Sequence, residues 1–154
     1  MRIKTAILFA FLLNLGYVSA QNVAIGERAP RVKSFKAQIE EGKYLYMGFV
    51  HSPSRPCEVS APKVLELIKS NDAISATLFT KEGEKECEKW LVDISKSGTM
   101  VVMEADEIFH RFGVEYAPFG VILDHKQRVL WQGNPQTLDK SKIENIIQQW
   151  TSQR

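Results

Sequence analysis

The stretch FVHSPSRPCEVSAP, residues 49–62, decides the fold prediction. It begins at the end of the run YLYMGFV, residues 44–50, whose nearly continuous apolar character is typical of a strand buried on both faces. Pro56 suits the first turn of a helix, where its missing N–H costs nothing, whereas Pro62 falls inside that helix and should kink it. The stretch therefore predicts a buried strand, a short loop, and a helix that carries Cys57 in its first turn.

Hydrophobic periodicity predicts that strands and helices alternate along the rest of the chain. The strand-like runs are residues 73–79, 99–103, 119–124 and 128–133, and the helix-like runs are residues 56–70, 82–98, 106–113 and 137–150. Within the run 82–98, Cys87 and Trp90 share one helical face. The last two strands flank a short turn and predict an antiparallel hairpin. This order predicts an α/β sandwich, with a central mixed β-sheet flanked by helices.

The N-terminus has the pattern of a cleavable secretory signal. Arg2 and Lys4 precede an apolar run, and small residues at 18–20 end it. The apolar run is shorter than the roughly 20 residues that a membrane-spanning helix needs. We therefore expect a signal peptide at residues 1–20, one domain at residues 21–154, and no membrane span after cleavage. The expected location is secreted, or periplasmic if the source is bacterial.

The charge of the predicted mature domain excludes some classes of partner. The signal segment holds two of the 20 Lys and Arg residues and none of the 18 Asp and Glu residues, so residues 21–154 carry 18 of each. No basic stripe remains to indicate nucleic acid or an anionic membrane. The three histidines, His51, His110 and His125, form no recognisable metal-binding set. Neither a metal nor a cofactor is predicted.

Four segments together resemble the thioredoxin-like superfamily, in particular its secreted TlpA/ResA-like branch, which is related to the AhpC/TSA and Redoxin proteins. They are IGERAP at 25–30, the stretch 49–62, GVEYAPFGVILD at 113–124 and RVLWQGNPQTLDKSKIENII at 128–147. The resemblance implies a thioredoxin-like sandwich with a cis-proline at Pro118. It also implies a groove beside Ala117, Pro118 and Phe119 that binds protein thiols or disulfides, or an extended peptide segment.

The chain departs from this family at the redox motif. Aligned with C-x-x-C, it has Ser54-Arg55-Pro56-Cys57, so the attacking cysteine is replaced by serine. A serine hydroxyl is un-ionised near neutral pH and needs an adjacent base to attack. We expect Cys57, at a helix N-terminus that favours the thiolate, to be the reactive thiol, and Ser54 to donate a hydrogen bond to it. Redox turnover is then weak, or depends on Cys87 as the resolving thiol.

Two alternatives remain open on the sequence. In the first, Cys57 is the peroxidatic and Cys87 the resolving cysteine of an atypical two-cysteine peroxiredoxin-like peroxidase, although Val50 stands where that motif has proline. In the second, the domain is a non-catalytic peptide- or protein-binding module and Cys57 is a buried structural cysteine. A Cys57–Cys87 disulfide is disfavoured, because the resemblance places the two helices on opposite faces of the sheet.

Overall fold

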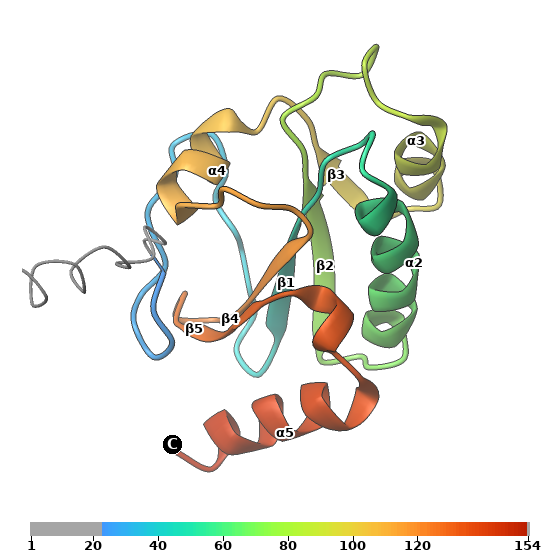
Figure 1. Ribbon diagram of the computed structural model, residues 1–154. Helices are drawn as coiled ribbons and strands as arrows, with labels where there is room; N and C mark the ends of the chain where they lie inside the picture. The colour runs from blue at the N-terminus through green and yellow to red at the C-terminus, as the bar shows by residue number, and fades with distance from the viewer. Residues whose placement is uncertain (1–22, 154) are drawn as a thin grey trace, which may run out of the picture.

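The computed structural model describes residues 23–153, which form one five-stranded sheet with helices on both faces (Figure 1). The predicted signal peptide lies outside the described residues. The elements, in chain order, are β1 (Tyr44–Phe49), α2 (Arg55–Lys69), β2 (Ile74–Phe79), α3 (Lys89–Lys96), β3 (Met100–Val102), α4 (Asp106–Phe112), β4 (Phe119–Asp124), β5 (Val129–Gly133), η1 (Pro135–Thr137) and α5 (Lys140–Thr151). Within residues 23–153, no helix combines the length and the apolar character needed to cross a bilayer.

The sheet is mixed, as the sequence predicts. Its strand order is β3-β2-β1-β4-β5, and β1 pairs with β2 in parallel and with β4 in antiparallel orientation. All six residues of β1 are buried, which explains its unbroken apolar run. The segment 25–30 lies beside the edge strand β5, where Gly26 N–H donates to the Val129 carbonyl oxygen (2.7 Å).

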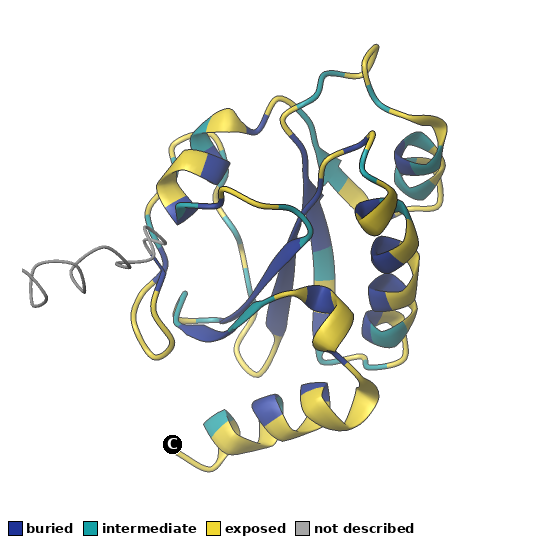
Figure 2. Cartoon of the chain, viewed as in Figure 1, coloured by how far each residue is buried: buried dark blue, intermediate teal, exposed yellow. Residues whose placement is uncertain are grey.

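Side chains of β1 alternate between two hydrophobic clusters, one on each face of the sheet. Tyr44 and Tyr46 pack on the face covered by α2, α3 and α5, which we call the α2 face. Leu45 and Met47 pack on the other face, against α4 and the N-terminal segment. In Figure 2 the side of α2 turned toward the sheet is buried and its outer side is exposed. The alternation of β1 and the buried side of α2 thus place apolar side chains of both elements in the cluster on the α2 face.

Two predictions about the region around Cys87 are wrong. α3 begins at Lys89, so Cys87 lies in the turn before the helix and not on it. In this turn the Glu86 and Cys87 N–H groups both donate to the Gly83 carbonyl oxygen (3.1 Å each). α2 and α3 also lie side by side on the same face of the sheet, and Cys57 and Cys87 pack in the same cluster (Figure 1).

Tyr46 fits into the α2 face because two neighbouring strand positions are glycine. A Cβ atom at Gly120 would lie 2.7 Å from Tyr46 Cε2, and one at Gly48 would lie 2.9 Å from Tyr46 Cε1 and 2.6 Å from Leu78 Cδ2. These separations are far below van der Waals contact, so both glycines are required by packing.

We expect Gly120→Ala to destabilise the protein by about 1–3 kcal/mol, because the buried ring has no room to move. Chemical denaturation measures the difference. Gly83→Ala is the matched control, since its nearest neighbour is the flexible end of the exposed Glu86 side chain, and we expect a change below about 0.5 kcal/mol. Equal losses in the two variants would contradict the packing role of Gly120.

Candidate functional site

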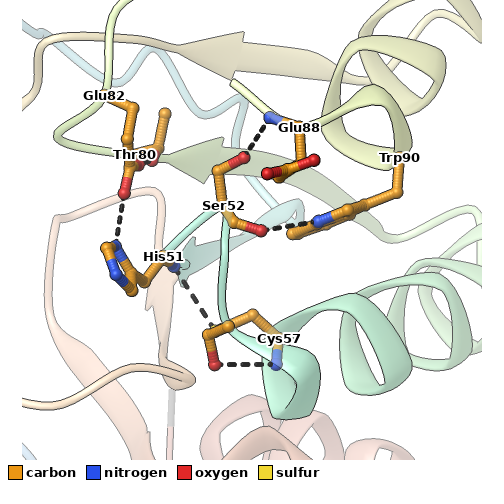
Figure 3. Close-up of polar contacts among 8 residues, drawn as sticks. His51, Ser52, Cys57, Thr80, Glu82, Glu88 and Trp90 are labelled. Atoms are coloured by element: carbon orange, nitrogen blue, oxygen red, sulfur yellow. Dashed lines mark hydrogen bonds and ion pairs between the residues drawn. The ribbon is translucent and has the colours of Figure 1, made fainter. Parts of the chain in front are cut away.

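Cys57 lies in the first turn of α2 and is sealed from solvent. Its exposed fraction is 0%, and its Sγ accepts a hydrogen bond from the His51 N–H at 3.4 Å (Figure 3). The thiol therefore faces the loop that leaves β1, as expected for a cysteine at this helix start. Because the side chain is fully buried, no external disulfide can reach the sulfur in this conformation.

Ser54 is the N-cap of α2. Its Oγ accepts a hydrogen bond from the Cys57 N–H at 3.4 Å, which satisfies one of the free donors in the first helical turn. The structure thus shows Ser54 as an acceptor toward the helix backbone, and donation from its hydroxyl to the thiol stays a prediction. The serine therefore has a structural reason to stand here that is independent of catalysis.

A groove lies beside Ser54. Its volume is about 350 Å³, and its lining comprises Val50, His51, Ser54, Lys81, Phe109, Val114, Glu115, Tyr116 and Ala117. The Ala117–Pro118 peptide bond is cis, as the resemblance implies. The structure therefore brings Ser54 and the cis-proline loop to one groove, although they are more than 60 residues apart in sequence.

Of the three predicted groove residues, Ala117 lines the groove, whereas Pro118 and Phe119 are not part of its lining. Phe119 is buried in the core, with its ring centroid 6.1 Å from that of Phe49, and it does not line the groove. Tyr116 lines the groove instead, and its side chain is 80% exposed. Phe119 is the first residue of β4, close after the cis bond. Because side chains of a strand alternate between its two faces, the Phe119 side chain points into the core on one face of the sheet.

The backbone of the cis-proline loop is open for pairing. The N–H groups of Glu115, Tyr116 and Ala117 donate to no backbone or side-chain acceptor among residues 23–153. Val114, in contrast, is tied to α4 by a hydrogen bond from its N–H to the Phe109 carbonyl oxygen (2.9 Å). The loop is thus anchored at one end and presents unpaired donors beyond it.

Polar contacts that no sequence pattern predicted join the loop after β1 to the acidic segment 82–88 and to Trp90. The Ser52 Oγ accepts a hydrogen bond from the Glu88 N–H, and the Ser52 carbonyl oxygen accepts one from Trp90 Nε1 (2.7 Å). His51 Nδ1 pairs with the Glu82 carboxylate, which also accepts a hydrogen bond from Thr80 (Figure 3). A buried serine has no periodicity or motif that would reveal this role.

Cys87 is poorly suited to act as a nucleophile. Burial raises the pKa of its thiol, and the carboxylates of Glu82, Glu86 and Glu84 raise it further because they repel a thiolate. In the described chain Cys57 and Cys87 are both free thiols. The thiol predicted to resolve a mixed disulfide therefore stays protonated at neutral pH.

Tyr46 shares the α2 face with Cys57. Burial raises the pKa of Tyr46, and the nearby Cys57 raises it further, so its hydroxyl keeps its proton.

As for metals, no group of three or more His, Cys, Asp or Glu side chains is placed to hold an ion within residues 23–153.

Comparisons of sequence find no relative, whereas comparisons of structure do. No protein-family model and no curated protein match the chain. A thioredoxin-like protein from Parabacteroides distasonis is similar with a TM-score of 0.66 at 13% identity, covering 82% of this chain and 96% of that one. A thiol:disulfide interchange protein from a Bacteroides species has a TM-score of 0.61 at 14% identity, covering 83% and 93%.

A secreted disulfide oxidoreductase from Mycobacterium tuberculosis is also similar, with a TM-score of 0.55 at 16% identity, covering 70% of this chain and 81% of that one. The shared architecture confirms that this chain has the thioredoxin-like fold.

We expect alkylation of Cys87 to require a higher pH than that of an ordinary cysteine, because its pKa is raised. Glu86→Gln removes one of the repelling charges, so the midpoint of the pH–rate profile should move to lower pH. Iodoacetamide labelling, read by mass spectrometry of the Cys87 peptide, gives the profile. Glu144→Gln on α5 is the control and should leave the midpoint unchanged. A midpoint that Glu86→Gln does not move would contradict the electrostatic assignment.

Proposed function

We propose that this chain is an exported thioredoxin-like protein of the thiol-disulfide oxidoreductase type, close to the TlpA/ResA-like branch, that binds an extended polypeptide with little redox turnover. The observation that carries the proposal is the separation of groove from thiol. Ser54 lines the open groove, whereas Cys57 is fully buried behind it. A partner can therefore occupy the groove without meeting a reactive sulfur.

Binding of an extended segment follows from the chemistry of the groove. The free N–H groups of the cis-proline loop can donate hydrogen bonds to the carbonyl oxygens of a partner strand. Such backbone pairing is the usual basis of β-strand addition. Val50, Phe109 and Val114 give the groove an apolar floor. Tyr116, exposed at the rim, offers the type of side chain that most often dominates binding energy at interfaces.

Weak redox turnover follows from the motif. In thiol–disulfide exchange a thiolate attacks one sulfur of a disulfide, a mixed disulfide forms, and a second thiol releases it. Ser54 cannot form the mixed disulfide, and Cys57 is buried. The same burial disfavours the peroxidase alternative, which requires peroxide to reach Cys57.

A second candidate, redox turnover that depends on Cys87, is favoured by one observation. Cys57 and Cys87 pack in the same hydrophobic cluster, and Ser52 ties the loop beside Cys57 to the segment beside Cys87. An opening of that loop would expose both thiols together. Two cysteines could then pass two electrons and two protons to a disulfide substrate and become a disulfide themselves.

The proposed location rests on the sequence and on the similar structures. The pattern at residues 1–20 is that of a secretory signal. The similar protein from Mycobacterium tuberculosis is described as secreted. Export would place the chain among unfolded or partly oxidised polypeptides, which are the class of partner that the groove fits.

Tyr116→Ser should weaken binding of an extended, unfolded polypeptide about tenfold, because an exposed aromatic anchor at the groove is lost. Fluorescence anisotropy with a labelled, reduced and carboxymethylated polypeptide measures the affinity. Met100→Ser is the matched control, since Met100 is also a largely exposed apolar side chain but lies on the edge strand β3. Equal losses in both variants, or no binding by the wild-type protein, would refute the groove as the binding site.

Ser54→Cys should restore a dithiol site. Ser54 Oγ lies 3.4 Å from the Cys57 backbone nitrogen, so a thiol introduced there would lie close to Cys57. We expect oxidised glutathione to oxidise the two thiols to a reducible intramolecular disulfide. The wild-type protein, treated with oxidised glutathione or hydrogen peroxide, should leave Cys57 unmodified until it is denatured. Mass spectrometry of the two cysteine peptides reads both results.

The outcomes of this oxidation experiment separate the candidates. Adding Cys57→Ser to the Ser54→Cys variant is the control and should abolish the intramolecular bridge. A rapid Cys57–Cys87 bridge in the wild-type protein would overturn weak turnover and favour chemistry that depends on Cys87. Failure of Ser54→Cys to oxidise would contradict the alignment of the motif itself.

A further inference from the structure

A second hollow lies between α2 and η1, on the α2 face and away from the groove. Its volume is about 190 Å³. Five of its lining residues are apolar: Val59, Val64, Leu67, Pro135 and Leu138. The remaining three are Ser60, Lys63 and Gln136, and none of the eight lines the cis-proline groove. We call this hollow the α2–η1 pocket.

Ser60 is the unusual residue of the α2–η1 pocket. Its side chain is only 3% exposed, and its Oγ has no hydrogen-bond partner among residues 23–153. A serine within a helix commonly donates to the carbonyl oxygen four residues earlier, and Ser60 does not. Leaving a buried hydroxyl unpaired costs about 1–3 kcal/mol, so its place in a pocket wall points to a ligand that completes the bond.

Lys63 lies beside Ser60 on the same face of α2. Residues three apart on a helix have Cβ atoms about 5–6 Å from each other, so one carboxylate group can accept hydrogen bonds from both side chains. Lys63 is exposed and forms no ion pair within the described part of the chain.

We propose that the α2–η1 pocket binds a small carboxylate with an apolar body of about one ring. The carboxylate would accept hydrogen bonds from Ser60 and Lys63, and the apolar body would lie on Val64, Leu67 and Leu138. The size agrees, because a cavity of about 150 Å³ lined by apolar side chains is known to hold one benzene molecule. The charge agrees as well, because Lys63 is the one ionisable side chain in the pocket lining.

Benzoate is the probe, and amide chemical shifts measured by NMR are the readout. We expect the amide shifts of the non-proline residues within 59–67 and 136–138 to change and to saturate with a Kd of roughly 1–10 mM, as small ligands of this size allow. Benzyl alcohol, which has the ring without the charge, should bind more weakly. Shifts around Tyr116 should not change, which separates this pocket from the groove and its failure from failure of the proposed function.

Two variants and one control test the assigned contacts. Ser60→Ala should weaken benzoate binding about two- to tenfold, and Lys63→Gln should weaken it about two- to fivefold. Lys69→Gln, a lysine near the end of the same helix and outside the pocket, should have no effect. If Ser60→Ala does not fold, the comparison of Lys63→Gln with Lys69→Gln decides alone.

Three results would overturn the proposal. The first is the absence of saturable shifts up to about 50 mM benzoate, an affinity too weak for a specific site. The second is equal binding of benzyl alcohol and benzoate. The third is an equal loss in Lys63→Gln and Lys69→Gln, which would reduce the effect to general charge.

Discussion

The start of α2 is the constraint on which the rest of the site depends. The first N–H groups of a helix have no partner within the helix, and they need acceptors from outside it. Ser54 supplies one, and in doing so it fixes the first turn with Cys57 turned inward. Ser54, which stands where the resembled family has its attacking cysteine, is therefore also the N-cap of the helix.

The loop before this helix is held from its other side as well. Ser52 binds the backbone of Glu88 and the indole of Trp90, and His51 pairs with Glu82. These contacts hold the acidic segment 82–88 against the α2 face, where its carboxylates oppose ionisation of Cys87. One set of contacts thus holds the loop before Cys57 and places Cys87 in a negative environment.

In the proposed function, the thioredoxin-like scaffold separates the surface that binds a partner from the sulfur chemistry. The groove keeps unpaired N–H groups, an apolar floor and an exposed tyrosine, all supplied by backbone course and packing. Exchange chemistry, in contrast, requires a particular exposed sulfur, and position 54 holds an oxygen. Recognition can survive this one-atom change, because it depends on many contacts, whereas exchange cannot.

The sequence by itself determined the order of strands and helices and the mixed sheet, because burial imposes a period of two on strands and 3.6 on helices. Through its resemblance to a known family, it also indicated the cis bond at Pro118 and the serine at position 54 in place of a cysteine. Only the tertiary structure decided that Cys57 is sealed, that Cys87 precedes its helix, that Phe119 is core and Tyr116 is rim, and that α2 and α3 share a face. These facts depend on contacts between residues far apart in the chain, such as Ser52 with Trp90, and no local pattern encodes such contacts.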